Sequence, residues 1–294
     1  MSRNPAMRRF TENSALGKRI SCRFVAGLTL QDAIAAIAAV NQLGMTATLD
    51  PLGENVHSGA AAERAAATAC TILDTIHQRR VDSTVSVKLT QFGLDLGLEP
   101  ARAQLRRVLE CARQWNTFIR VDMEGSDYTE ATVAMVEQLR GEGFHVGTVL
   151  QAYLHRTPTD LDRLLAQDVG IRLVKGAYKE PASIAWQDKS EVDARYVDLM
   201  RTLLDHGGYH AIATHDERMI QAAIAHARQC GRAPESFEFQ MLYGIRRDLQ
   251  RKLRTEGWQV RVYIPFGPEW YPYFMRRLAE RPANLLFLLK NLVK

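Results

Sequence analysis

The sequence predicts an α/β protein built as a (β/α)8 barrel. Apolar runs rich in β-branched residues alternate with helical stretches eight times, most runs end in a polar residue, and the chain has 294 residues. Regular alternation implies right-handed crossovers and a parallel sheet, and this length is typical of a closed eightfold barrel. The predicted strands span residues 45–50, 85–90, 118–123, 145–151, 171–175, 210–215, 237–242 and 259–264.

The helices are predicted from apolar periodicity and from residues that begin or end helices. Residues 29–43 should form a helix that Thr29 caps and Gly44 ends. Residues 60–79 are rich in alanine, which has the highest helix propensity. Pro100 marks the start of the helix after the second strand, because proline suits the first helical turn.

The connection after the fifth strand is long, since it separates Lys175 from a helix beginning near Lys189. Long ordered loops of this kind usually carry function. The last helix begins near Pro268, and an apolar tail follows it. Because no linker rich in serine, glycine or proline interrupts the units, we expect an N-terminal helical arm over 1–44 and one barrel domain over 45–294.

Composition and charge are those of an ordinary globular protein. Lys and Arg number 38 and Asp and Glu 33, which gives a net charge of +5. The arginines are spread along the chain, without the basic stripe of a nucleic-acid-binding protein. The N-terminus lacks the apolar segment of a signal peptide, and no run is long enough to span a bilayer. We therefore expect a cytoplasmic protein, whose contact with the inner membrane would be weak and peripheral.

The four cysteines lie far apart and form no CxxC pair. We expect neither a metal centre nor a disulfide, in keeping with a reducing compartment. Cys70 and Cys111 lie in amphipathic helical stretches, where cysteine usually acts as a small core residue.

Polar residues recur where the predicted strands end. They are Asp50, Lys88, Asp122, Gln151, Lys175, His215, Gln240 and Tyr263. Each has a structural alternative when taken alone; a strand-end aspartate, for example, is also a good helix cap. Their recurrence at one topological level favours a common pocket, because the C-terminal strand ends carry the chemistry of such barrels.

Strand parity places some charged residues on the barrel axis, because alternate residues of a strand face the same way. Arg120 and Asp122 should point inward together, and Arg172 should lie deeper than Lys175 and reach upward into the pocket. An inward Arg120 would be a buried cation that needs a partner. We expect Glu238, on an inward position of the seventh strand, to be that partner.

Common nucleotide, metal and hydrolase motifs are absent from the sequence. It has no GxGxxG or P-loop, no HExxH or His/Cys cluster with metal-ligand spacing, and no GxSxG. What remains is a pocket rich in cations, namely Lys88, Arg172, Lys175, Arg276 and Arg277. Such a pocket suits a carboxylate substrate and an anionic cofactor.

Several strings together resemble the proline dehydrogenase family. They are IRLVKGAY, ATHD, FEFQMLYG, VRVYIPFG and YFMRRLAE, and VSVKLTQFG and IRVDME match as well. Seven matches in the family's order, over roughly residues 20–285, are highly specific. The resemblance implies a monofunctional FAD-dependent enzyme on a distorted barrel. It would oxidise L-proline to Δ1-pyrroline-5-carboxylate, the first step of proline catabolism to glutamate, and pass electrons to a quinone.

The resemblance also implies roles for individual residues. Lys88, Arg276 and Arg277 would hold the proline carboxylate, with both arginines on a final helix over the barrel mouth. Around the proline ring it places Asp122, Tyr178, Leu242 and Tyr263. Arg172 would approach flavin N5, and the other expected FAD contacts are Met123, Gln151, Lys175, Gly176, Ala177, Thr214 and His215. The acids expected to pair with the site's cations are Glu54 and Glu280.

The chemistry of these side chains agrees with those roles. Guanidinium groups form bidentate hydrogen bonds with a carboxylate, so arginines and a lysine can fix an amino acid in one pose. Such orientation is worth on the order of 7–11 kcal/mol at best. Arg172 would stabilise charge developing near N5, and Asp122 would balance the cationic floor as the second catalytic candidate. Tyr263 would limit the space beside the ring and favour proline over hydroxylated analogues.

Two alternatives remain open from the sequence. One is another flavin barrel, such as a methylenetetrahydrofolate reductase-like protein, although its pterin substrate would not require the Arg276–Arg277 pair. The other is a catalytically inactive barrel with a binding role, which the presence of Lys88, Asp122 and Arg172 disfavours. The sequence leaves the electron acceptor and the oligomeric state undetermined.

Overall fold

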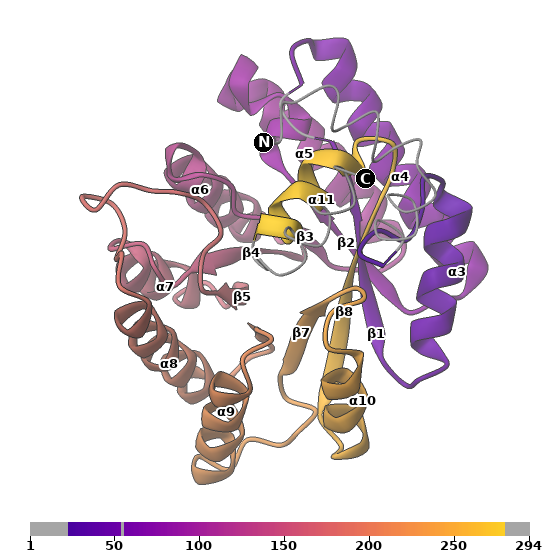
Figure 1. The fold of residues 1–294 in the computed structure, drawn as a ribbon. Coiled ribbons are helices and arrows are strands. Elements are labelled where there is room, and N and C mark those ends of the chain that lie inside the picture. Colours follow the sequence, from indigo (N-terminus) through magenta and orange to yellow (C-terminus); the bar gives the residue numbers. More distant parts are fainter. Residues whose placement is uncertain (1–22, 54–55, 280–294) are drawn as a thin grey trace, which may run out of the picture.

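The computed structural model describes residues 23–53 and 56–279 and forms a closed barrel (Figure 1). The eight strands are parallel and follow one another in sequence order, and β1 pairs with β8 to close the sheet. They are β1 (Thr46–Pro51), β2 (Ser83–Val87), β3 (Ile119–Val121), β4 (Val146–Gln151), β5 (Gly170–Val174), β6 (Ala211–Ala213), β7 (Glu238–Leu242) and β8 (Gln259–Phe266). The predicted fold is confirmed.

Helices surround the sheet, and their positions follow the predicted alternation (Figure 1). They are α3 (Leu30–Asn41), α4 (Gly59–Arg79), α5 (Leu98–Gln114), α6 (Thr129–Gly141), α7 (Thr157–Leu165), α8 (Lys189–His206), α9 (Glu217–Gln229), α10 (Arg247–Thr255) and α11 (Trp270–Ala279). Thr29 caps α3 as predicted, through a capping box with Asp32. The last helix, α11, follows β8 and borders the barrel mouth.

Three strands end two or three residues before the predicted position, and each one stops where a polar side chain turns into the barrel mouth. β2 ends at Val87 because residues Leu89–Phe92 form the 3-10 helix η1, which begins after Lys88. β3 ends just before Asp122, and β6 ends just before Thr214. After β2 and β3 the apolar residues Leu89 and Met123 still follow, so hydrophobicity alone does not mark those two ends, whereas the residues directly after β6, beginning with Thr214, are polar.

The apolar strand residues face the helices, and the polar ones face the barrel axis. Fully buried side chains of the layer between sheet and helices include Leu49, Val85, Val87, Ile119, Val121, Ile171, Leu173, Phe239 and Val262. The alternate positions hold buried polar or charged groups, including Ser86, Arg120, Asp122, Arg172, Glu238 and Gln240. The strand parity deduced from the sequence is therefore correct.

The predicted Arg120–Glu238 ion pair is wrong. Arg120 is buried, but its Nη1 donates to the carbonyl oxygens of Thr148 at 2.9 Å and Gly170 at 2.6 Å. Glu238 instead accepts hydrogen bonds from Arg261 Nε, at 2.9 Å to each carboxylate oxygen. Arg261 lies on β8, the strand beside Glu238, and therefore reaches this carboxylate directly.

The expected absence of a disulfide is also wrong, because Cys70 and Cys111 are bonded. They lie 41 residues apart in the sequence, on the packed helices α4 and α5, with 5.7 Å between their Cα atoms. This is an ordinary Cα separation for a disulfide. The pairing depends on the helix packing, which sequence spacing does not reveal.

Several expectations fall outside the described residues. These are the first half of the N-terminal arm, over residues 1–22, the apolar tail and the two acids Glu54 and Glu280. Among the residues described, no helix combines the length and the apolar character that crossing a membrane requires.

Gly147 on β4 leaves no room for a side chain, and its replacement tests the packing of the barrel. A Cβ there would lie 2.1 Å from the Gly170 carbonyl oxygen and 2.6 Å from the Phe118 ring. We expect Gly147→Ala to lower the free energy of unfolding by about 1–3 kcal/mol or more, because the obstructing atom belongs to the neighbouring strand. Urea denaturation measures the loss.

The matched control is Gly141→Ala at the end of α6, where an added Cβ meets nothing within 4 Å. This change should leave the unfolding free energy unaltered or raise it by up to about 1 kcal/mol. Equal stability of the two variants would contradict the close approach of β4 and β5 at Gly147.

Candidate active site

The polar strand ends converge on one pocket at the barrel mouth, with a volume of about 650 Å³. Every strand contributes to its lining directly or through the residues that follow it, and α11 adds Tyr273, Arg276 and Arg277. Each predicted site residue that the structure describes borders this pocket: Lys88, Asp122, Met123, Gln151, Arg172, Lys175, Gly176, Ala177, Tyr178, Thr214, His215, Leu242, Tyr263, Arg276 and Arg277. The convergence predicted from topology is therefore present.

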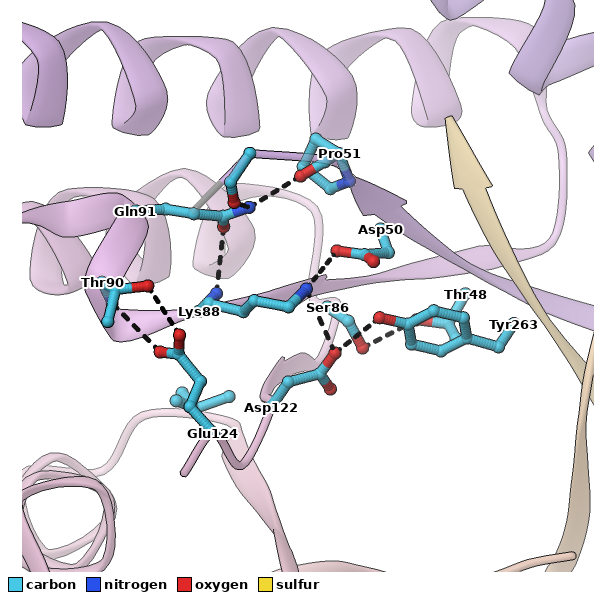
Figure 2. Close-up of polar contacts among 12 residues, drawn as sticks. Thr48, Asp50, Pro51, Ser86, Lys88, Thr90, Gln91, Asp122, Glu124 and Tyr263 are labelled. Atoms are coloured by element: carbon cyan, nitrogen blue, oxygen red, sulfur yellow. Dashed lines mark hydrogen bonds and ion pairs between the residues drawn. The ribbon is translucent and has the colours of Figure 1, made fainter. Parts of the chain in front are cut away.

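Lys88 lies between two carboxylates on the floor of the pocket (Figure 2). Its Nζ is 2.7 Å from Asp50 Oδ1 and 3.8 Å from Asp122 Oδ2. The backbone around it is fixed by Gln91, whose Oε1 accepts from the Lys88 N–H at 3.0 Å and whose Nε2 donates to the Pro51 carbonyl at 2.7 Å. The turn after β2 thus holds the ammonium group toward the barrel axis.

Asp122 connects the charged groups of the floor. Its Oδ1 accepts from Arg172 Nη1 at 2.7 Å, and its Oδ2 accepts from the Tyr263 hydroxyl at 2.7 Å (Figure 2 shows the tyrosine contact). Burial alone would raise the pKa of this carboxyl, but the Arg172 and Lys88 charges outweigh it and hold the pKa below its ordinary value. Asp122 is therefore ionised at neutral pH.

Arg172 is held in a single orientation from three sides. Besides Asp122, it donates from Nε to Gln240 Oε1 at 2.5 Å and from Nη2 to Ser86 Oγ at 3.1 Å. Its Cζ also lies 5.1 Å from the centre of the Tyr263 ring, within cation–π range. The reach of Arg172 upward from the middle of β5 agrees with the parity argument.

Two strand-end residues without an assigned role prove to hold the cations in place. Asp50 is buried and pairs with Lys88, and Gln240 is buried and pairs with Arg172. Desolvation raises the pKa of Asp50, although the Lys88 charge acts against this shift. Their position at strand ends indicated from the sequence that both residues face the pocket. It did not indicate which side chain across the barrel each of them contacts.

A second wall of the pocket follows β4, β5 and β6. Gln151 is buried and donates to the Glu124 carbonyl at 3.1 Å. Lys175 forms ion pairs with Asp193 and, at 3.0 Å, with Asp216. His215 Nε2 accepts from the Leu242 N–H at 3.0 Å, which fixes the imidazole.

Asp193 and Asp216 were not predicted as site residues. Asp216 caps α9, and hydrogen bonds from Arg218 and Lys175 lower its pKa. Asp193 lies on α8, 18 residues after Lys175, so its contribution depends on how α8 packs against the barrel. Together the two acids hold the Lys175 side chain at the pocket edge.

Comparison with known proteins gives concordant results. A model of the proline dehydrogenase family matches residues 33–290. The chain is 40% identical to proline dehydrogenase 1 of Bacillus subtilis subsp. natto, over 100% of this chain and 97% of the relative. It is 41% identical to a proline dehydrogenase of Deinococcus radiodurans, over 92% of this chain and 89% of the relative.

The fold is also shared with solved structures. The barrel matches proline utilization A (PutA) from Bdellovibrio bacteriovorus with a TM-score of 0.83 and 23% identity, over 89% of this chain and 32% of that protein. The family model spans most of the chain, and the bacterial relatives match it almost from end to end. The chain therefore belongs to the proline dehydrogenase family.

Proposed function

We propose that the protein is an FAD-dependent proline dehydrogenase that oxidises L-proline to Δ1-pyrroline-5-carboxylate and passes the electrons to a quinone. Family membership supports the dehydrogenase activity and proline as the substrate, and it disfavours both a folate-dependent flavin barrel and an inactive barrel. The observation that carries the proposal is the pocket itself. It combines three cations suited to a carboxylate with a separate wall of hydrogen-bonding groups.

The substrate carboxylate would bind Lys88 from the floor and Arg276 and Arg277 from α11. Arginine offers two parallel donors to a carboxylate, and a lysine adds a third point of attachment. The Lys88 ammonium is already fixed by Asp50, so its position would not need to be ordered when the substrate binds. The ring would then lie against Tyr178, Leu242 and Tyr263, which border the same pocket.

FAD would occupy the wall formed by Gln151, Lys175, Gly176, Ala177, Thr214 and His215, with Met123 and Arg172 nearby. The residues present fit this group, because they offer amide, ammonium, hydroxyl and imidazole groups in a cavity of cofactor size. When bound, FAD accepts the hydride removed from the substrate ring. Arg172 is fixed beside this wall and would supply positive charge there without reorganising.

Asp122 would contribute a fixed negative charge and would not accept a proton. Its lowered pKa makes it a poor acceptor for the proton of the substrate amine. The ionised carboxylate instead keeps Lys88 and Arg172 in place. Tyr263 donates to it as a neutral phenol, since burial raises the tyrosine pKa well above its ordinary value.

A quinone acceptor is lipid-soluble, so weak peripheral contact with the inner membrane would give a cytoplasmic enzyme access to it. Mild net positive charge, +5, is compatible with such a contact.

The first prediction tests the function directly. The purified protein should show the visible spectrum of an oxidised flavin, and anaerobic addition of L-proline should bleach it, because the substrate hydride is transferred to the cofactor. Anaerobic absorption spectroscopy measures both. A colourless protein that does not take up added FAD would contradict the proposal, as would a flavin that L-proline leaves oxidised.

Arg276→Met tests the carboxylate clamp. Loss of a charge-assisted hydrogen bond is worth about 1.5–3 kcal/mol, so KM for proline should rise roughly 10- to 100-fold while FAD stays bound. Steady-state kinetics and the flavin-to-protein ratio measure the two effects. The control is Arg251→Met, an exposed arginine on α10. Loss of flavin with an unchanged KM would place Arg276 on the cofactor instead.

Tyr263→Phe tests the support of Asp122. The variant removes the 2.7 Å hydrogen bond to the carboxylate, and we expect kcat/KM to fall about tenfold. The matched control is Tyr196→Phe, a fully buried tyrosine outside the pocket whose hydroxyl donates at 3.4 Å to the Leu173 carbonyl. Both variants should lose similar stability, about 1 kcal/mol. An equal loss of kcat/KM in both would refute a specific role for Tyr263.

A further inference from the structure

A second cavity, which we call the lower cavity, lies at the opposite end of the barrel and encloses about 290 Å³. The residues that matter for its chemistry are Arg120, Arg140, His210, Glu238 and Arg261. Most of these lie at the N-terminal ends of strands or just before them. Arg172 and Gln240 border both cavities and lie between the lower cavity and the pocket at the mouth.

Arg120 carries the inference because its guanidinium is buried and only partly satisfied. The residue is 5% exposed, and its Nη1 donates to two backbone carbonyls. Nε has no hydrogen-bond partner, and among the described residues none accepts from Nη2. Nε and Nη2 form one edge of the guanidinium, the pair of parallel donors that matches a carboxylate or phosphate.

No carboxylate in the part of the chain that the structure describes forms an ion pair with Arg120. Glu238 is engaged by Arg261 and also accepts from the Tyr209 hydroxyl at 2.9 Å. Asp168 lies at the exposed rim and forms no ion pair among the described residues. Burial and the nearby Arg172 charge lower the pKa of Arg120 to about 9, so it remains a cation at neutral pH.

Two further donors border the lower cavity. Arg140, on α6, donates to backbone carbonyls, those of Gln167 at 3.2 Å and Phe144 at 3.5 Å, and to no carboxylate of the described residues. His210 is 3% exposed, and its Nδ1 accepts from the Ile171 N–H at 3.3 Å, which assigns the ring proton to Nε2. Among the described residues Nε2 makes no well-formed hydrogen bond, although the Gly207 carbonyl lies near enough to raise the pKa of the ring. Burial lowers the His210 pKa to about 4, against the effect of the Gly207 carbonyl, so the imidazole is a neutral donor.

We propose that the lower cavity binds a small oxyanion of the size of inorganic phosphate, with the free edge of Arg120 as its bidentate donor. Arg140 and the His210 Nε2–H would complete the donor set. A buried cation with unmade hydrogen bonds is costly, and an oxyanion would satisfy both its charge and its donors. The enclosed volume suits a small anion rather than a cofactor. This site is separate from the proposed proline and FAD pocket.

Isothermal titration calorimetry of the full-length protein with inorganic phosphate, at constant ionic strength set by chloride, tests the proposal. One phosphate should bind saturably. Arg120→Gln should raise Kd at least tenfold, because it removes the charge and both free donors. Arg140→Gln should weaken binding about tenfold and provides the test if Arg120→Gln does not fold. The matched control is Arg201→Gln on α8, an exposed arginine outside the cavity, which should bind as the parent protein does.

Two further measurements test where phosphate binds and which class of anion the lower cavity prefers. Arg276→Met should leave phosphate binding unchanged, whereas a loss of binding in this variant would place the anion in the upper pocket and overturn the proposal. Acetate in place of phosphate distinguishes a carboxylate ligand from a tetrahedral one, and tighter acetate binding would overturn the assignment of a phosphate-like anion. Unsaturable binding, or equal affinities in Arg120→Gln, Arg140→Gln and Arg201→Gln, would also overturn it.

Discussion

The structure depends on charge compensation inside the barrel, and Asp122 is the centre of that compensation. A (β/α)8 barrel usually fills its interior with apolar layers, but here the upper layers hold Lys88 and Arg172, both nearly buried. Two buried cations this close need a shared anion with good geometry. Asp122 meets that need with one carboxylate oxygen toward each cation, and Asp50 and Tyr263 support the arrangement.

This arrangement links the fold to the proposed chemistry. The strands bring the Asp122, Arg172 and Tyr263 side chains into contact, because parallel pairing around a closed sheet fixes the position of each strand. The cations are consequently oriented before any ligand binds. Preorganised charge of this kind stabilises a developing negative charge without the cost of reorganisation. The same feature keeps Asp122 ionised and so favours an electrostatic role over proton transfer.

The alternation of strands and helices was sufficient to predict the barrel, and the level of the strand ends was sufficient to predict the pocket. What the sequence could not supply were partners across the barrel or between packed helices. Glu238 pairs with Arg261 on the adjacent strand instead of Arg120, and Cys70 bonds to Cys111 across two helices. Strand parity determines which way a side chain points. Which residue it then contacts depends on the length of the side chain and on the register between the strands.

The pairing that Glu238 makes explains why the two ends of the barrel differ. In the upper layers each buried cation has a carboxylate partner, Asp50 or Asp122. In the lower layer Arg261 engages the buried carboxylate of Glu238, and Arg120 is left with two carbonyls and a free edge. Gly147, which pairs with Arg120, and Gly170 leave room for the Phe118 ring, and the Arg120 guanidinium lies over that ring. Among the described residues Arg120 is therefore a buried cation without a carboxylate partner, and it lies on the side of Arg172 that faces away from the proposed substrate.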